Sequence, residues 1–434
     1  MRIPSLRTVV GLAAVVALGT SVPAAAAPHV PSGPSGVDSA RCPRLSTALE
    51  WFGDNRERLQ RAIDERGTCS NPDLKRGERP VAAFDWDNTV TKNDITDLAI
   101  AWALKHDRIL RPANWADTSP WLTEKAVRRL TEACGTDVPV GRPLRTSTNI
   151  ACTDEIFSIR EGAKLVSGEN AFTGDWNRRR TVPQYAWVSQ LFAGHTEAEV
   201  NAIARASRAA ALAAPVGSTQ KVGSHTIHAY ARYYPQMRNL ISTLKRAGFE
   251  VWIDSAGAAP ITEPWAAGVG IDREHVIAIR NVLDRRGRIT TTIKGCGGEP
   301  EGKGENIPYI EGKRCWLNQE AFGVTGPAAW QRQAPRHRPA IVAGDANTDV
   351  SMVEDATAAH LVINRNQNEI LCKAYDNADG RWVVNPMFIE PLPRKSTAYP
   401  CSTTGFVNPD GSLGPVLRQD GTVIPDQRDT VHGR

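Results

Sequence analysis

The sequence lacks several features that would point to particular classes of protein. Its Lys and Arg residues form no run of five, and the net charge is only +5 over 434 residues, so neither a nucleic acid nor a membrane surface is expected as a partner. No two cysteines have the C-x-x-C spacing of a zinc cluster. After residue 26 no apolar stretch approaches 18 residues, so no transmembrane helix is expected.

The composition that remains is that of a folded protein. Hydrophobic residues make up 41% of the chain and charged residues 23%, which excludes a disordered or collagen-like chain. The length is enough for two or three domains with a large core.

The first residues have the pattern of an export signal. Arg2 and Arg7 precede an apolar run from Val9 to Leu18, and Ala24 to Ala26 form a small-residue cleavage site. We therefore expect a signal peptide over 1–26 and a secreted mature protein of net charge +3, because two of the five excess positive charges lie in the leader. A membrane anchor is the alternative, and the shortness of the apolar run disfavours it.

The eight cysteines all lie after the leader, and their even number fits an oxidising compartment. Eight cysteines allow about 105 pairings. We predict that neighbours pair, because each bond then closes a short loop within one region. The predicted bonds join positions 42 and 69, 134 and 152, 296 and 315, and 372 and 401.

Short apolar runs alternate with helical periodicity along much of the chain, which predicts an α/β fold with a parallel sheet. Strands are expected at 80–84, 249–253, 339–343 and 360–363, and a hairpin around Asp284 to Gly287. Helical spacing starts near Leu45 and continues to Arg66. The stretch from 110 to 231 lacks the alternation and contains a capping box, Thr196-x-x-Glu199, that opens a helix.

Apart from the signal peptide, these patterns divide the chain into four parts. We expect a leader and helical segment over 27–77, a catalytic core over 78–109 and 232–395, an inserted, mostly helical domain over 110–231, and an irregular tail over 396–434.

The clearest chemical motif follows the first expected strand. Asp85 and Asp87 are two residues apart in Asp-Trp-Asp-Asn-Thr, directly after Pro80 to Phe84. Ligands of open α/β sheets bind at the carboxyl ends of the strands. Two carboxyl groups there can act as nucleophile and as general acid and base, although an acidic turn with a capping role is the simpler alternative.

A second acidic strand end strengthens the functional interpretation. Asp345 and Asp349 follow the strand that ends near Ala343. Carboxylates from two neighbouring loops are the hard oxygen ligands that Mg²⁺ prefers. The sequence therefore predicts a divalent-cation site.

Phosphate-binding groups are expected between the two acidic loops. Ser255 ends the strand at 249–253 and offers a hydroxyl beside backbone N–H groups. Lys303 is the candidate for a fixed positive charge, and Lys294 and Lys313 are its rivals. Ser255 as a helix cap and Lys303 as a solvated lysine are the alternatives.

Taken together and in this order, the four segments resemble the phosphatase branch of the haloacid dehalogenase superfamily. The matching patterns are D-x-D-x-T from Asp85, a serine at a strand end, K-x-x-x-I from Lys303, and G-D-x-x-x-D from Gly344. The sequences Phe84-Asp-Trp-Asp-Asn-Thr89 and Tyr234-Pro-x-Met237 look most like those of exported bacterial phosphorylcholine phosphatases. The resemblance implies a Rossmann-like core with helices on both faces and a cap inserted between the first and second motifs.

The resemblance also implies a role for each matching residue. Asp85 would attack phosphorus, Asp87 would be the general acid and base, and Thr89 would orient Asp87. Ser255 and Lys303 would hold the phosphoryl oxygens of the substrate. The implied ligands of Mg²⁺ are Asp85, the backbone carbonyl of Asp87, Asp345, and Asp349 directly or through water. Asp254 departs from the pattern, and we expect its side chain to point away from the phosphate.

The expected substrate is a small phosphoester, with phosphorylcholine as the specific candidate. Trp86 is the aromatic residue best placed to contact a cationic head group, and core packing is its alternative. Asp94 and Asp97 are further candidates for that contact. Phosphatases of sugar phosphates or nucleotides, and an inactive exported binding protein, are the competing interpretations. The sequence does not determine the oligomeric state.

Overall fold

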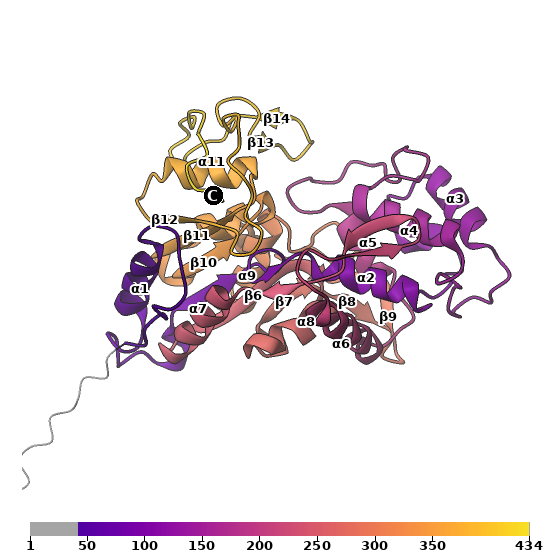
Figure 1. Ribbon diagram of the computed structural model, residues 1–434, viewed down its shortest axis with the longest axis horizontal. Helices are drawn as coiled ribbons and strands as arrows, with labels where there is room; N and C mark the ends of the chain where they lie inside the picture. The colour runs from indigo at the N-terminus through magenta and orange to yellow at the C-terminus, as the bar shows by residue number, and fades with distance from the viewer. Residues whose placement is uncertain (1–41, 434) are drawn as a thin grey trace, which may run out of the picture. The chain divides into compact units, whose positions relative to one another are not determined.

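The computed structural model describes residues 42–433, and their central element is a six-stranded parallel sheet (Figure 1). The predicted signal peptide over 1–26 lies outside the described residues. All neighbouring strands of the sheet are parallel. In spatial order the strands are β12 (Trp382–Pro386), β11 (Ala359–Asn364), β10 (Ile341–Gly344), β1 (Val81–Phe84), β6 (Glu250–Ala258) and β7 (Val276–Ile279).

Helices cover both faces of this sheet, as parallel sheets require. Alternate residues of β1 face opposite ways, and Phe84 packs with Leu59 and Leu240 whereas Ala83 packs with Leu317 and Leu371. The first face carries α1 (Asn55–Arg66) and α7 (Pro235–Arg246), and the second carries α9 (Glu311–Phe322), α10 (Val350–Glu354) and α11 (Asn368–Asp376). The predicted Rossmann-like fold class is confirmed.

A group of helices lies to one side of the sheet in Figure 1. It comprises α2 (Ile95–Lys105), α3 (Glu124–Cys134), α4 (Ile150–Gly162), α5 (Pro183–Gln190), α6 (Glu197–Ala213) and α8 (Ala259–Ala266). The capping box at Thr196 and Glu199 opens α6 as predicted. The predicted hairpin is present as β8 (Asn281–Leu283) and β9 (Ile289–Ile293).

Three further pairs of short strands complete the described elements. They are β2 (Thr91–Lys92) with β5 (Arg232–Tyr233), β3 (Thr219–Val222) with β4 (His225–His228), and β13 (Phe406–Val407) with β14 (Leu413–Gly414). The last pair belongs to the tail after Cys401, which is otherwise irregular as expected.

The helix predicted from Leu45 is shorter than expected. The chain forms turns up to Asp54, and α1 begins only at Asn55. Gly53 adopts the left-handed conformation there, with φ +53°, which interrupts the helix before α1. Of the apolar residues whose spacing suggested a helix, Leu45 is buried in the core and Phe52 is exposed. Between them Trp51 packs edge to face against Phe388 with ring centroids 5.2 Å apart.

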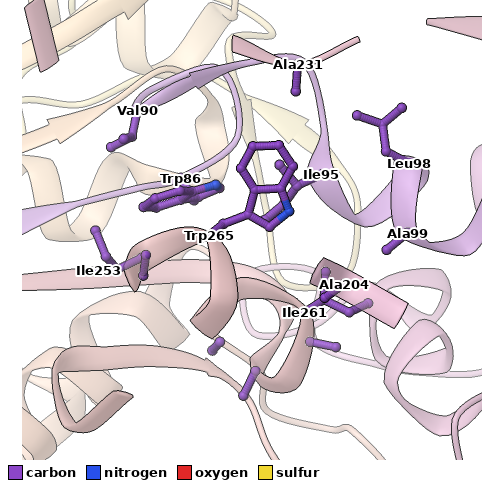
Figure 2. Close-up of a cluster of buried hydrophobic side chains, with 14 of the residues drawn as sticks. Trp86, Val90, Ile95, Leu98, Ala99, Ala204, Ala231, Ile253, Ile261 and Trp265 are labelled. Carbon is purple, nitrogen blue, oxygen red and sulfur yellow. The ribbon is translucent and has the colours of Figure 1, made fainter. Parts of the chain in front are cut away.

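The first acidic loop runs through the hydrophobic core. Trp86 is fully buried and lies beside Trp265. Val90, from the same loop, and Ile95, the first residue of α2, are close by (Figure 2). Its ring also packs edge to face against Tyr233 at 6.1 Å. The tryptophan therefore anchors the loop that carries Asp85 and Asp87.

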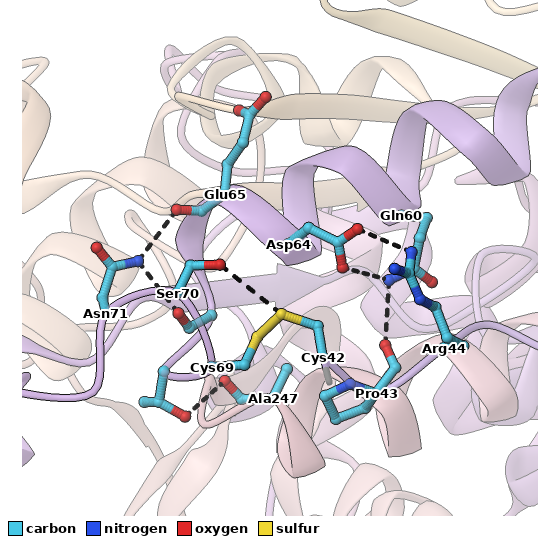
Figure 3. Close-up of a disulfide and its surroundings, with 12 residues drawn as sticks. Cys42, Pro43, Arg44, Gln60, Asp64, Glu65, Cys69, Ser70, Asn71 and Ala247 are labelled. Carbon is cyan, nitrogen blue, oxygen red and sulfur yellow. Dashed lines mark hydrogen bonds and ion pairs between the residues drawn. A yellow bond between two sulfur atoms is a disulfide. The ribbon is translucent and has the colours of Figure 1, made fainter. Parts of the chain in front are cut away.

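Four disulfides join neighbouring cysteines, and the predicted pairing is confirmed at every position. The bond between Cys42 and Cys69 brackets α1, where Arg44 and Gln60 meet Asp64 (Figure 3). Such bonds are typical of proteins in oxidising compartments. Among residues 42–433, no helix has the length and apolar character needed to cross a membrane.

Candidate active site

Three buried carboxyl groups meet at the carboxyl edge of the sheet. Asp85 directly follows β1, Asp345 follows the adjacent β10, and Asp349 lies in the short helical turn after it. One oxygen from each lies within 4.8 Å of the others. Parallel neighbouring strands end side by side, which explains why two loops 260 residues apart converge here.

Lys313 lies at the centre of this cluster. Its ammonium nitrogen is 2.7 Å from Asp85 Oδ1 and 2.8 Å from Asp349 Oδ1, and it donates to the backbone carbonyl of Asp254 at 2.6 Å. The side chain is fully buried. Burial lowers the pKa of Lys313, but the charges of Asp349 and Asp85 outweigh it, so the pKa lies above its ordinary value.

Lys303 is not brought to the site, and the prediction for this residue is corrected. Its ammonium group donates to Thr291 Oγ1 at 2.7 Å, on the β8–β9 hairpin. The loop before α9 runs along that hairpin, whereas the first turn of α9 points at the strand ends. Lys313 is in that turn, and Leu317 occupies the buried position four residues later where an Ile was expected.

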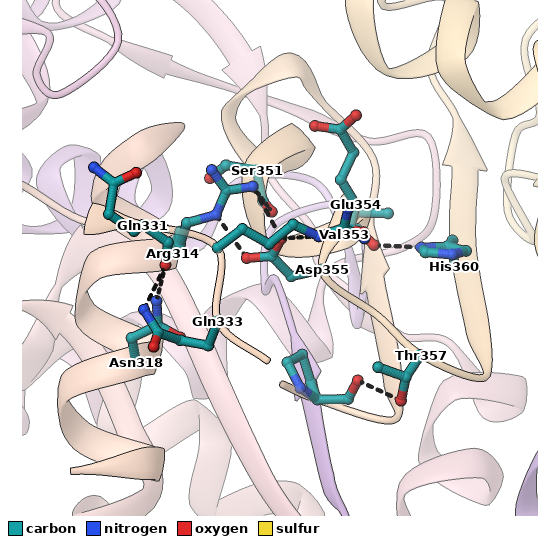
Figure 4. A network of polar contacts seen from close by, with 12 residues as sticks. Arg314, Asn318, Gln331, Gln333, Ser351, Val353, Glu354, Asp355, Thr357 and His360 are labelled. Carbon is teal, nitrogen blue, oxygen red and sulfur yellow. Dashed lines mark hydrogen bonds and ion pairs between the residues drawn. The ribbon is translucent and has the colours of Figure 1, made fainter. Parts of the chain in front are cut away.

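Contacts from a neighbouring helix hold α9 in this orientation. Arg314 donates two hydrogen bonds to Asp355, at 2.6 and 2.9 Å, and a third to the carbonyl of Ser351 at 3.0 Å (Figure 4). Asp355 is the residue after α10. A bidentate pair between Arg314 and Asp355 fixes both the distance and the orientation of α9 relative to α10. Arg314 is next to Lys313, so it helps to keep the Lys313 ammonium group beside the carboxylates.

Thr89 acts on different partners from those predicted. Its hydroxyl oxygen lies 2.8 Å from Asp85 Oδ2 and 3.0 Å from Asp345 Oδ1. A hydroxyl has one proton, so it donates to one of the two carboxyl groups at a time. Asp87 is oriented instead by the backbone N–H of Ile95, at the start of α2, which donates to its Oδ1 at 2.8 Å.

Asp87 is only partly buried and lines the same cavity as Asp85. Burial raises the pKa of Asp87 well above its ordinary value, and the charges of Asp94 and Asp85 add to the effect. Burial also raises the pKa of Asp85, with Asp349 adding to it and Lys313 opposing it. Asp87 therefore has the character of a general acid, and it lies beside Asp85, whose two oxygens are oriented by Lys313 and Thr89.

Ser255 lies within the adjacent β6, three residues before its end at Ala258, so this strand runs beyond its expected end at 253. The Ser255 hydroxyl accepts from the N–H of Gly257 at 3.1 Å. The two residues after it, Ala256 and Gly257, line the cavity. Asp254 does not line it. Its carboxyl oxygens are buried and have no hydrogen-bond partner among the described residues, and burial raises its pKa well above the ordinary value.

The cavity has a volume of about 320 Å³ and an acidic mouth. Asp94, Asp97 and Glu161 line the mouth together with Arg160 and Tyr185. Arg160 pairs with Asp97 at 3.0 Å and lies over the Tyr185 ring, 5.1 Å from its centre. Burial raises the pKa of Asp97 to about 7 against the opposing charge of Arg160.

The Trp86 ring lies in the core and does not line the cavity, so the core-packing alternative for this residue is confirmed. Tyr185 is the aromatic residue at the mouth. Arg365, which directly follows β11, was also missed. It donates to Asp345 Oδ2 at 2.7 Å and lines the cavity. Neither Tyr185 nor Arg365 belongs to a recognisable motif, so only the fold brings them to the site.

The three carboxylates fit a divalent cation. They supply hard oxygen donors from two rigid strand ends, and Lys313 and Arg365 offset part of their repulsion. The donor set is therefore one that a hard cation such as Mg²⁺ accepts, and it contains no sulfur or imidazole ligand.

Residues 165–354, somewhat under half of the chain, match the family model of haloacid dehalogenase-like hydrolases. The matched range includes Ser255, Lys313, Asp345 and Asp349.

Solved structures were also compared. A conserved protein of unknown function from Anaerococcus prevotii is 16% identical over 78% of this chain and 93% of that one, with a TM-score of 0.48. A phospho-aspartyl intermediate analogue of phosphoserine phosphatase is 14% identical over 66% of this chain and 86% of that one, with a TM-score of 0.29. The comparison with curated proteins gave no match.

Proposed function

We propose that the protein is a secreted, Mg²⁺-dependent phosphomonoester hydrolase that acts through an aspartyl-phosphate on Asp85. The observation that carries the proposal is a cavity lined by Asp85, Asp87 and Asp345. Asp85 and Asp345 form an acidic triad with the buried Asp349, and Lys313 offsets part of the charge of this triad. A family match to hydrolases and four disulfides support the reaction class and the compartment.

Asp85 is the nucleophile in this proposal. An oxygen of its carboxylate attacks phosphorus, and the bond between phosphorus and the ester oxygen breaks as the aspartyl-phosphate forms. Lys313 and Thr89 hold the two oxygens of this carboxylate, so it is already oriented before the substrate binds. Asp85, the backbone carbonyl of Asp87, Asp345 and Asp349 would hold Mg²⁺, which would supply charge stabilisation to the phosphoryl group.

Asp87 moves the proton in both halves of the reaction. Burial raises the pKa of Asp87, which favours the protonated form that gives its proton to the departing alkoxide. The resulting carboxylate then takes a proton from the water that attacks phosphorus, which releases phosphate and regenerates Asp85. The hydrogen bond from Ile95 keeps one oxygen of Asp87 fixed while the other faces the cavity.

Ser255 and the backbone after it complete the phosphoryl pocket. The hydroxyl and the N–H groups of the β6 end supply neutral donors to phosphoryl oxygens. Residues 110–231 act as the cap that forms the mouth, because Arg160 and Tyr185 from this range lie opposite the strand ends.

The leaving group is expected to be cationic, with phosphorylcholine as the specific candidate. Six carboxyl groups and two guanidinium groups line the cavity, and the acidic excess is concentrated at the mouth in Asp94, Asp97 and Glu161. A quaternary ammonium group there is attracted by these charges and by the Tyr185 ring.

A larger leaving group is the second candidate. A cavity of about 520 Å³ adjoins the first and shares Asp94, Asp97, Glu161 and Arg365 with it. This space is enough for a sugar or a nucleoside, so phosphatase activity on such esters is the alternative within the same reaction class.

The test is phosphate release by the purified mature protein in Mg²⁺ from phosphorylcholine, an aryl phosphate, sugar phosphates and nucleotides. Asp85→Asn is the matched variant, because it keeps the shape of the side chain and removes the nucleophile. We expect turnover that the variant abolishes, with the highest kcat/KM for phosphorylcholine. Release from none of the esters would overturn the proposal and favour a binding protein.

A further inference from the structure

Lys313 uses all of its hydrogen-bond donors within the protein. An ammonium group has three N–H bonds, and the Lys313 nitrogen has three close oxygen partners, in Asp85, Asp349 and the Asp254 carbonyl. The residue lies behind the carboxylates and does not line the cavity. It therefore organises the nucleophile but leaves no donor for an oxygen of the phosphoryl group.

Two other cations line the cavity, and only one is placed beside the acidic triad. Arg160 is 7% exposed and is committed to Asp97 and to the Tyr185 ring at the mouth. Arg365 is 35% exposed in its side chain and donates one N–H to Asp345, 2.7 Å away. A guanidinium carries five N–H donors in a rigid fork, so four remain.

We propose that Arg365 binds the transferring phosphoryl group through its free donors, and that the C-terminal tail, residues 396–434, positions it. The inference rests on the proposed phosphatase function and adds a residue and an element to it. The planar fork of an arginine matches the oxygens of a phosphoryl group in two places, which a lysine cannot do.

The residues on either side of Arg365 are held by the tail. Asn364 donates to Asp429 Oδ1 at 3.0 Å and to the carbonyl of Val431 at 2.6 Å. Asn366, in the left-handed conformation at φ +59°, accepts from the Tyr399 hydroxyl at 2.9 Å. These two asparagines thus anchor the turn from opposite sides of Arg365.

This anchor is buried and cross-linked. Asn364, Tyr399 and Asp429 are each at most 3% exposed, and leaving a buried polar group unpaired destabilises the folded state. The disulfide between Cys372 and Cys401 joins α11, the helix that follows the turn, to the residue two positions after Tyr399. The tail therefore has no independent freedom to move away from the turn.

The experiment measures the binding of inorganic phosphate by calorimetry in Mg²⁺, together with kcat and KM for an aryl phosphate. Arg365→Ala is expected to weaken phosphate binding roughly 10- to 100-fold, the range for lost hydrogen bonds to a charged group. Arg365→Lys restores part of the loss, and so does free guanidinium ion added to the alanine variant. Arg336→Ala, at an exposed arginine outside the tail, is the control and is expected to change neither quantity.

The positioning role is tested by Tyr399→Phe, which removes only the hydroxyl that holds Asn366. We expect weaker phosphate binding and lower kcat/KM, and no further loss when Tyr399→Phe is added to Arg365→Ala, because both changes act through one guanidinium. Ser402→Ala, at an exposed tail hydroxyl bonded to Asp426, is its control.

Each outcome tests one part of the proposal. Unchanged phosphate affinity in Arg365→Ala would overturn the role of Arg365, and additive losses in the double variant would overturn the role of the tail. If hydrolysis is absent in every protein but phosphate binding still depends on Arg365, the proposed function fails, and the part of the inference that stands is that Arg365 binds a phosphate ion.

Discussion

The strongest single perturbation that the structure offers is Lys313→Met. Methionine has a similar length, but the change removes the only buried cation between Asp85 and Asp349 among the described residues. Removing one member of a buried ion pair costs about 3–5 kcal/mol, because the remaining charge is left without compensation. The matched control is Lys303→Met, which removes one hydrogen bond from a partly exposed lysine at a cost of about 0.5–1.5 kcal/mol.

These energies convert into distinct shifts of the melting temperature. With an unfolding entropy of about 2.1 cal/mol/K per residue, a folded unit of about 390 residues loses roughly 4–6 °C in Lys313→Met and under about 2 °C in Lys303→Met. The loss should be larger at pH 8 than at pH 5, because burial raises the pKa of Asp85, so this carboxyl group takes up a proton in acid and avoids an unpaired charge.

The assay is thermal unfolding in EDTA, so that no cation replaces the ammonium group, followed by phosphate release in Mg²⁺. Lys313→Met is expected to be inactive, and Lys303→Met to keep most of its activity. An active and stable Lys313→Met together with an inactive Lys303→Met would refute the assignment of the site lysine.

Three further changes test other parts of the site and the core. Asp254→Asn should be more stable than the native protein at pH 8 and equal to it near pH 4. The raised pKa of Asp254 makes the folded state hold the extra proton, so native stability falls as pH rises above the ordinary carboxyl range, and melting temperatures across pH measure this slope. Asp97→Asn should abolish the decrease in KM for phosphorylcholine that is expected as pH rises through about 7, where Asp97 loses its proton, and a KM profile unchanged by the substitution contradicts the role of Asp97. Trp86→Ala should lower the free energy of unfolding by about 3–5 kcal/mol, measured in urea, because it removes a fully buried ring from the core; a loss below about 1 kcal/mol would not fit that packing.

Much of the site could be predicted because its carboxyl groups lie directly after strands that the sequence pattern identifies. Asp85 and Asp345 each follow a short apolar strand, and parallel strands of one sheet end at one edge, so their meeting follows from fold class alone. The disulfide pairing was predictable for a similar reason. Every bond closes a loop of fewer than 30 residues within one region of the chain.

The parts of the site that the sequence did not predict depend on where individual side chains point in the folded protein. Lys303 and Lys313 both lie between Ser255 and the acidic loop that carries Asp345. Only the start of α9 decides which of the two lysines faces Asp85. Thr89 is four residues from Asp85 and two from Asp87, yet the turn directs its hydroxyl to the first. Arg365 and the tail residue Tyr399 carry no motif, because their roles arise from contacts between distant segments.

The most direct test of the central claim is to trap the covalent intermediate. The mature protein is mixed with a radiolabelled phosphomonoester in Mg²⁺ and quenched in acid within one turnover, and the labelled peptide is identified by mass spectrometry. Phosphate attached to Asp85, absent in Asp85→Asn and accumulating in Asp87→Asn, is the result that the account predicts. Hydrolysis of the ester with no label on Asp85, or with label on another residue, would contradict it.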